Sequence, residues 1–267
     1  MKKGILLIKS SNFQNYLANS MFANDMIDEI ILEEGTSLRN KVYLNFNNFF
    51  ENLRYIINPK NLYFKIYQLL NYHNFYGATL FHNKRILGNQ NIILNDKIKI
   101  TKTNSINSIE VKNYLFNKKF KYIYIFGTSL IDLNIYKELI TDFINVHWGY
   151  SQSYRGEGIV SCISNNDFNK LGVTIHFLSK TIDQGKIIKQ KLINIDKYDN
   201  FYSIGLKMTF EATKILCDKN LDTLLINAKE ETDMGKLYNS YYIKKNYDIF
   251  YKAQKNLKSF KHEKNLI

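Results

Sequence analysis

Two side chains able to donate hydrogen bonds or move protons stand two residues apart at the end of an apolar segment. Asn145 and His147 flank Val146, so in a strand both point to one face while Val146 points to the other. An imidazole can take or give a proton near neutral pH, and an amide can donate a hydrogen bond to a developing negative charge. Taken singly, a histidine there is usually a packing residue and an asparagine a turn cap.

Further polar segments follow along the chain. Residues 172–177 (GVTIHF) have the composition of a strand, and Asp183 lies in the turn-like segment 181–185 (TIDQG) that comes after it. By itself Asp183 fits an Asx turn. Between the two strands lies a glycine-punctuated loop, residues 153–158 (SYRGEG), with one of only four arginines in the chain. Ligands bind outside the carboxyl ends of strands in open α/β sheets, which makes the strand end at His147 the candidate site.

In this order the segments resemble the formyltransferases that use N10-formyltetrahydrofolate. The resemblance rests on Asn145-x-His147, Tyr154-Arg155-Gly156, Gly172-Val173-Thr174 and Asp183-x-Gly185. It is best over residues 100–193, where it includes Ile106-Asn107-Ser108 and Phe126-Gly127-Thr128-Ser129, and it is faint over residues 40–95. The family includes enzymes that formylate glycinamide ribonucleotide, methionyl-tRNA and amino sugars.

The resemblance implies that Asn145, His147 and Asp183 are a catalytic trio. An amine attacks the formyl carbon of the folate through a tetrahedral intermediate with negative charge on oxygen. Asn145 would donate a hydrogen bond to that oxygen, and His147 would stabilise the same charge or shuttle the amine proton. Asp183 would orient the imidazole and relay a proton through water. This chemistry needs no metal, and no two of the five histidines stand at metal-ligand spacing.

The resemblance also implies binding residues for the two substrates. The pterin of the formyl donor would lie against Phe126, Gly127, Thr128, Ser129 and Leu130, and near Lys180, Thr181 and Ile182. The acceptor would meet Trp148, Tyr154, Arg155 and Gly156. Core packing is an equal alternative for Phe126, as is loop solvation for Arg155. The family commonly has a proline in the turn after the histidine, and the geometry of the turn where Gln152 replaces it stays open.

The elements that must position these residues alternate between strands and helices. We expect strands over residues 4–8, 26–32, 98–101, 122–126, 143–146, 173–177 and 187–193. We expect helices over residues 13–22, 108–116, 134–140 and 200–217, and one or two more within 42–82, broken at Pro59. The pattern predicts an α/β fold, a Rossmann-like doubly wound and mostly parallel sheet. A catalytic domain over residues 1–219 would be followed by a short C-terminal extension over 220–267 with a basic helical tail.

The charge balance favours anionic partners. Lysine and arginine total 37 against 24 acidic residues, which gives a net charge of +13. The lysines are scattered among asparagine, isoleucine and tyrosine, a composition that drift toward A/T-rich codons would also produce. The tail from Lys244 could be a basic arm for nucleic acid, although we expect a solvated terminal helix. A basic nucleic-acid-binding protein on a formyltransferase-like scaffold is therefore the alternative from a different class.

Several other classes lack their signatures. There is no GxGxxG after the first strand, which disfavours a nicotinamide or flavin dinucleotide, and no GxxxxGK[ST], HExxH or GxSxG motif. No apolar run is long enough for a membrane span, and the first one ends at Lys9, too short for a signal peptide. Cys162 and Cys217 have no CxxC partners. We therefore expect a cytoplasmic protein in a reducing compartment.

The expected function is transfer of the formyl group of N10-formyltetrahydrofolate to a nucleotide-linked amino sugar, for a bacterial surface glycan such as lipopolysaccharide. Residues 235–238 (GKLY) resemble the short tail of the sugar-modifying branch. We expect the chain to be too short for the full C-terminal tRNA-contacting domain of the methionyl-tRNA enzymes. Expected partners are the sugar nucleotide and the folate, with no stable nucleic acid and a possible homodimer. The alternatives are another amine acceptor, such as glycinamide ribonucleotide or an aminoacyl group, and a hydrolase that releases formate.

Overall fold

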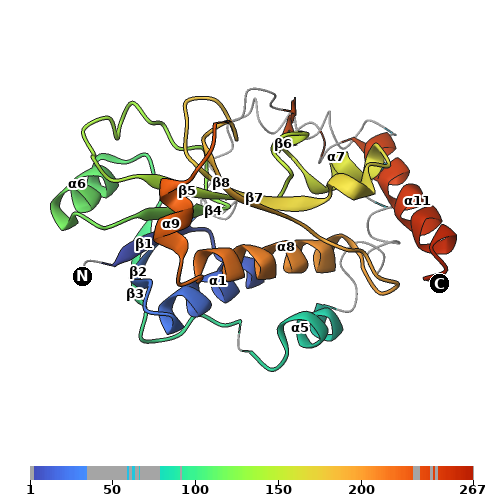
Figure 1. Ribbon diagram of the computed structural model, residues 1–267, viewed down its shortest axis with the longest axis horizontal. Helices are drawn as coiled ribbons and strands as arrows, with labels where there is room; N and C mark the ends of the chain where they lie inside the picture. Colours follow the sequence, from blue (N-terminus) through green and yellow to red (C-terminus); the bar gives the residue numbers. More distant parts are fainter. Residues whose placement is uncertain are drawn as a thin grey trace.

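A seven-stranded sheet with the strand order β3-β2-β1-β4-β5-β7-β8 forms the centre of the computed structural model (Figure 1). The structure describes residues 3–34, 79–90, 92–230, 235–240 and 246–266, with Pro59, Leu62, Tyr63, Ile66 and Ile243. The strands are β1 (Gly4–Ile8), β2 (Ile27–Glu33), β3 (Lys99–Thr103), β4 (Ile123–Phe126), β5 (Phe143–His147), β7 (Gly172–Phe177) and β8 (Ile187–Leu192). Strands β1 to β5 pair in parallel, whereas β7 pairs antiparallel with both β5 and β8. This confirms the expected mostly parallel α/β sheet.

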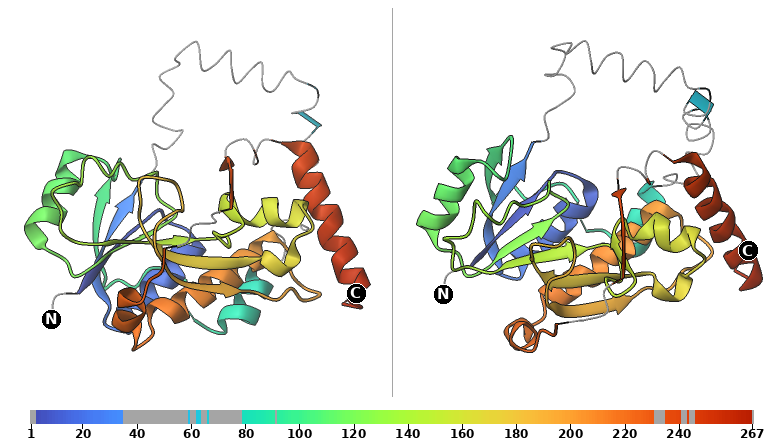
Figure 2. Two further views of the ribbon diagram at one scale, coloured as in Figure 1. Left: turned by 45° about the horizontal axis from the view of Figure 1, so that its top comes forward. Right: turned by 90° about the horizontal axis from the view of Figure 1, so that it is seen from above.

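Helices cover both faces of the sheet. They are α1 (Asn12–Ala23), α5 (Thr79–Leu87), α6 (Ile109–Lys118), α7 (Ile159–Ser164), α8 (Phe201–Leu216), α9 (Leu221–Ile226) and α11 (Tyr247–Glu263). A 3₁₀ turn, η1 (Phe168–Lys170), precedes β7. Helices α1 and α8 lie together on one face of the sheet, and α6 lies on the other (Figures 1 and 2). No helix in the described part of the chain is long and apolar enough to cross a membrane.

The alternation of side chains along the strands divides the core into two layers. In β1, Leu6 and Ile8 join the apolar cluster that includes Leu17 of α1 and Ile204 of α8. Their neighbours Ile5 and Leu7 join the cluster beneath α6. The central strands β1 and β4 are covered on both faces, and every residue in them is buried and, apart from Gly4, apolar, as a buried parallel sheet requires.

The C-terminal segments pack back on the sheet domain. Strand β9 (Lys236–Tyr238) pairs in parallel with β6 (Tyr154–Gly156) to form a separate two-stranded sheet. Helix α11, red in Figure 1, buries Phe250, Ala253 and Leu257 on one stripe and lies beside α7. The lysine-rich tail is thus a packed helix with one apolar face.

Most predicted elements lie within two residues of the observed ones, but the helix predicted over residues 134–140 is wrong. Here the amides of Ile135, Tyr136 and Leu139 donate to carbonyls three residues earlier, which makes successive turns. Tyr136 is the only residue of this stretch that is buried, so the segment lacks the apolar stripe that stabilises a helix on a sheet. The helices predicted within residues 42–82 lie mostly outside the described residues.

Candidate active site

Strand β5 presents Asn145 and His147 on one face. Val146 belongs to the core layer shared with α1 and α8, so its two neighbours point to the opposite side, as the alternation predicts. His147 is 5% exposed, whereas Asn145 is half-buried. Both side chains are directed to the turn that follows β7, where Asp183 lies.

The Asp183 carboxylate is the point on which the predicted residues converge. Its Oδ2 lies 3.3 Å from Nδ1 of His147 and accepts the backbone N–H of Gly156 at 2.8 Å. Its Oδ1 accepts a hydrogen bond from Nδ2 of Asn145 at 3.3 Å. Asp183 has φ +52°, an uncommon value for a residue with a side chain. The structure therefore brings the predicted trio together and adds a main-chain donor from β6.

His176 is a fourth member of this cluster that the sequence reasoning did not assign. It is 1% exposed, and its Nε2 lies 3.1 Å from Nδ2 of Asn145 and 3.4 Å from Oδ1 of Asp183. Its Nδ1 lies 2.8 Å from the Phe177 carbonyl, while Nε2 faces both the Asn145 amide and the Asp183 carboxylate. The missed signal was strand direction: antiparallel pairing of β5 with β7 places Asn145 opposite His176.

The site holds a neutral base next to a fixed anion. Burial lowers the pKa of His147 below its ordinary value of 6.5, although Asp183 and the Tyr154 carbonyl act in the opposite direction. Burial alone would raise the pKa of Asp183, but the imidazoles of His147 and His176 and the Gly156 amide together lower it to about 2. At neutral pH the imidazole of His147 can therefore accept a proton while Asp183 remains ionised.

The predicted acceptor-binding residues lie on β6 and the turn before it. The Tyr154 carbonyl lies 2.9 Å from Nε2 of His147, and the ring of Tyr154 stacks on the ring of Tyr238 in β9. The Arg155 guanidinium donates to the carbonyls of Ile182 and Gly235, and so joins the Asp183 turn to the segment before β9. These contacts show that β6 shapes the site mainly through its backbone.

Trp148 continues the alternation of β5 to the other face. Its ring packs edge-on against Phe13 at 4.7 Å and against Phe126 at 5.5 Å between ring centroids, and it lies close to Gly205 of α8. This environment favours a packing role over the acceptor contact predicted for Trp148.

The segments predicted to bind the formyl donor differ in exposure. Phe126 is 3% exposed and belongs to the core, the alternative considered for it. Beyond it, Gly127, Ser129 and Leu130 are exposed and Thr128 is half-buried. Lys180, Thr181 and Ile182 are exposed in the turn before Asp183. Both segments can therefore be reached by a ligand.

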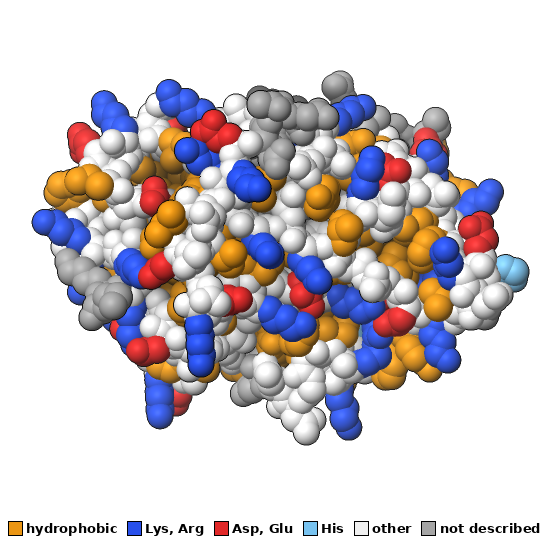
Figure 3. All heavy atoms as spheres, viewed as in Figure 1, with side chains coloured by type: hydrophobic (Ala, Val, Ile, Leu, Met, Phe, Trp, Pro, Cys, Tyr) orange, Lys and Arg blue, Asp and Glu red, His pale blue; other side chains and the backbone are white. Residues whose placement is uncertain are grey.

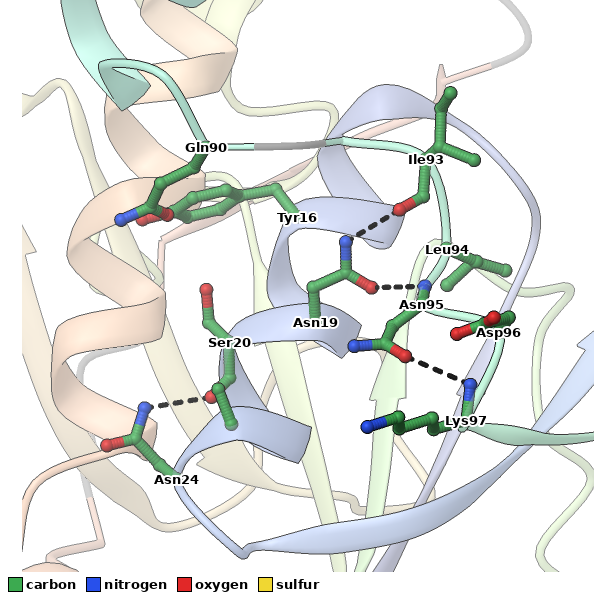
Figure 4. A pocket seen from close by; sticks show the side chains of 11 residues that line it. Tyr16, Asn19, Ser20, Asn24, Gln90, Ile93, Leu94, Asn95, Asp96 and Lys97 are labelled. Atoms are coloured by element: carbon green, nitrogen blue, oxygen red, sulfur yellow. Dashed lines mark hydrogen bonds between the residues drawn. The ribbon is translucent and has the colours of Figure 1, made fainter.

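Two surface hollows lie elsewhere. Figure 4 shows one of about 710 Å³ between α1, Gln90 and residues 93–97, where Asn19 donates to the Ile93 carbonyl and accepts the Asn95 amide. The other, of about 640 Å³, is bordered by Gln184 and Gly185 and by α9. None of the trio lines either hollow. Within the residues that the structure describes, no three His, Cys, Asp or Glu side chains gather to hold a metal ion.

Six curated proteins match part of the chain in sequence, and two of them illustrate the likeness. The bifunctional polymyxin resistance protein ArnA of Wigglesworthia glossinidia brevipalpis is 29% identical over 153 residues, 57% of this chain and 23% of that protein. A methionyl-tRNA formyltransferase from Azobacteroides pseudotrichonymphae is 31% identical over 96 residues, 34% of this chain and 30% of that protein. The chain thus spans less than a third of either relative. No family model matches it.

Solved structures match nearly the whole chain. A sugar N-formyltransferase from Shewanella sp. superposes with a TM-score of 0.56 at 16% identity, covering 96% of this chain and 87% of that one. The chain has the fold of the N-formyltransferases. A 4-N-formyltransferase from Francisella tularensis gives a TM-score of 0.50 at 15% identity and coverages of 90% and 77%. WlaRD, a sugar 3N-formyltransferase crystallised in the presence of dTDP and 5-N-formyl-THF, gives a TM-score of 0.51 at 16% identity. The match covers 96% of this chain and 79% of that one.

These comparisons confirm the resemblance to formyltransferases that the motifs indicated. The sequence relatives include enzymes of that class, and the structural neighbours share the fold over both the sheet and the C-terminal elements.

Proposed function

We propose that this protein transfers the formyl group of N10-formyltetrahydrofolate to the amine of a nucleotide-linked amino sugar. The observation that carries the proposal is the convergence of Asn145, His147 and the Gly156 amide on the ionised Asp183. Its other support is the likeness in sequence and fold to formyltransferases.

Each member of the cluster can be given a role that its environment supports. The donor supplies an electrophilic formyl carbon. Neutral His147 takes the proton that the acceptor amine loses and passes it to N10 of the folate, which leaves as tetrahydrofolate when the bond between the formyl carbon and N10 breaks. The Asp183 carboxylate, 3.3 Å away, stabilises the imidazolium formed in between. Asn145 donates to the oxygen on which charge develops. Because Nδ2 of Asn145 now contacts both Asp183 and His176, one of these contacts is exchanged when that oxygen arrives.

The two substrates would approach the trio from different segments. We assign the formyl donor to residues 127–130 and 180–182, which are accessible, and the acceptor to Tyr154, Arg155 and Gly156. Support for two such ligands comes from WlaRD, which was crystallised in the presence of dTDP and a formylated folate.

An amino sugar is favoured as acceptor by the pairing of β9 with β6. The segment before and within β9 is the one that resembles the sugar-modifying branch, and it pairs residue for residue with the Tyr154–Gly156 strand beside His147. The element indicative of sugar enzymes is thus part of the wall of the site. We further propose that the reaction takes place in the cytoplasm and serves the synthesis of a surface glycan such as lipopolysaccharide.

A comparison of acceptors tests the proposal. dTDP-, UDP- and GDP-linked amino sugars, glycinamide ribonucleotide and methionyl-tRNA are each incubated with N10-formyltetrahydrofolate at fixed ionic strength, and a mass gain of one formyl group is followed. We expect the highest kcat/KM for a sugar nucleotide. A higher value for either other acceptor would refute the sugar assignment but not the formyl transfer. Formate release without any acceptor would instead indicate hydrolysis, the activity named for a relative from Arabidopsis thaliana.

A further inference from the structure

A carboxylate outside the trio is buried at the end of β2. Glu33 is 3% exposed, whereas the side chain of its neighbour Glu34 is 48% exposed. A buried charge is costly unless it is paired and hydrogen-bonded. Glu33 meets this condition through contacts to three different segments of the chain.

Both oxygens of Glu33 accept backbone amides from loops at the carboxyl edge of the sheet. Oε1 accepts the N–H of Ile106, after β3, at 3.3 Å. Oε2 accepts the N–H of Ser129, after β4, at 2.8 Å. A single side chain therefore ties two loops together, and hydrogen bonds to an ionised acceptor are the stronger kind.

Lys9 completes this anchor from the end of β1. Its Nζ lies 3.4 Å from Oε2 of Glu33 and donates to Oγ of Ser129 at 3.1 Å. Ser129 is thus held through its main chain by the anion and through its side chain by the cation.

A second side chain holds the next part of the same loop. Asn107 donates to the Leu130 carbonyl at 2.8 Å and accepts the Asp132 amide at 2.9 Å. The loop after β4 begins at Gly127, whose φ of +68° turns the chain away from the strand. From there its main chain is fixed by side chains of other segments, and Glu33 is the buried, charged member of that set.

We propose that Glu33 is a positioning residue for the formyl donor, because it sets the backbone of residues 127–130 against which the donor lies. The inference rests on the proposed function, which assigns this loop to the donor. Glu33 contacts neither substrate in this scheme. Its carboxylate acts through the Ser129 amide.

The test is Glu33→Gln, with Glu34→Gln as the matched control. Glutamine keeps the shape of the side chain but replaces one carboxylate oxygen by an NH₂ group. That group is a donor, so it cannot accept a hydrogen bond from the backbone N–H that faced the oxygen, and one of the two hydrogen bonds is lost. Glu34 pairs with Lys102 on the surface at 2.7 Å, so its replacement leaves the loop untouched. For Glu33→Gln we expect the KM for N10-formyltetrahydrofolate and the Kd for 5-formyltetrahydrofolate to rise about tenfold, the lower end for a charge-assisted hydrogen bond. The values of kcat and of the acceptor KM should change less than about twofold.

Hydrogen exchange of residues 127–131 gives a readout that is independent of activity. Exchange should accelerate in Glu33→Gln and not in Glu34→Gln. Unchanged donor affinity in a folded Glu33→Gln protein overturns the inference, as does an equal loss of kcat and of both affinities, which would indicate general damage.

A second pair of variants decides the question if Glu33→Gln does not fold. Lys9 and Lys102 both have exposed side chains, so Lys9→Met is compared with Lys102→Met. Donor Kd should rise about threefold for Lys9→Met alone, as expected for one partly exposed pair, and equal values overturn the inference. A wild-type protein that binds no formylated folate refutes the proposed function itself, a result that these variants cannot mimic.

Discussion

At the scale of single residues, the site is defined by the acceptor capacity of one carboxylate. Asp183 receives the Gly156 amide and the Asn145 side chain and faces two imidazoles, so both of its oxygens are occupied. This explains why it stays ionised despite burial, and why a neutral His147 beside it can serve as a base. Asp183 thus remains negatively charged throughout the reaction, whereas His147 gains and loses a proton.

The first prediction concerns the base. Replacing His147 with Asn should lower kcat by about 10²–10⁴-fold, the range for removal of a general base, and should leave the Kd for 5-formyltetrahydrofolate within about twofold of the wild-type value. His262→Asn is the control, because His262 is exposed on α11. Turnover near the wild-type rate in a folded His147→Asn protein would contradict the assignment.

The second prediction is a pH profile. Because the pKa of His147 is lowered, the acidic limb of kcat/KM should lie below pH 6.5, the ordinary histidine value. Asp183, with a pKa of about 2, remains charged throughout and contributes no limb there. The Asp183 anion raises the pKa of His147, so in Asp183→Asn the limb should move to still lower pH while the rate falls about 10² or more. A limb above pH 7 in the wild type would show that the imidazole is not held neutral by burial.

At the scale of elements, alternation along strands was the part of the site that the sequence could predict. It placed Asn145 and His147 on one face of β5 and Val146 on the other. The same rule, carried one residue further, places Trp148 on the face of α1 and α8, where its ring is found. Pairing direction could not be predicted: nothing local distinguishes an antiparallel β7, and without that direction His176 is one more strand residue.

The pairing of β6 with β9 is the second feature that local sequence patterns could not predict. Strands β6 and β9 have three residues each, and the paired residues Tyr154 and Lys236 are 82 positions apart in the sequence. Neither has a hydrophobic period of its own. Their pairing depends on Gly156, whose φ of +78° and close contact with the Tyr238 carbonyl leave no room for a side chain.

The third prediction uses this contact. An added Cβ at Gly156 would lie 2.3 Å from the Tyr238 carbonyl oxygen, whereas at Gly88, with φ +67°, nothing lies within 4 Å. Both Gly→Ala changes carry the left-handed backbone cost of about 1–2 kcal/mol. Gly156→Ala should lose a further 1–3 kcal/mol or so by urea unfolding, the usual cost of overpacking. It should also lower kcat more than about tenfold, because the Gly156 amide that holds Asp183 is displaced. If the two variants were equally stable, β9 would be able to move away from the added methyl group without a loss of folding free energy, which would contradict the prediction.

At the scale of the whole molecule, the charged side chains of the face drawn in Figure 3 are spread rather than gathered. Figure 3 shows lysine and arginine side chains on this face interleaved with acidic and apolar ones. The lysine-rich tail is committed to α11, whose apolar stripe packs beside α7. A net charge of +13 attracts any anion over a distance, and on the face drawn in Figure 3 the described basic side chains do not form the continuous track that a nucleic acid backbone requires.

The last prediction separates these two uses of the charge. Screening acts on diffusional capture, because the Debye length falls from about 10 Å at 0.1 M salt to about 3 Å at 1 M. Raising the salt between these limits should therefore lower kcat/KM for a nucleotide-linked amino sugar by roughly three- to tenfold, with kcat nearly constant. A neutral glycoside of the same amino sugar serves as the control and should be insensitive, since it has no diphosphate for the protein to attract. Duplex DNA, titrated under the same conditions, should bind no more tightly than about 10⁻⁵ M, within the non-specific range. DNA binding below micromolar that falls steeply with salt, together with a salt-insensitive reaction, would mean that the positive charge serves a nucleic acid and that the sugar nucleotide is recognised by contact alone.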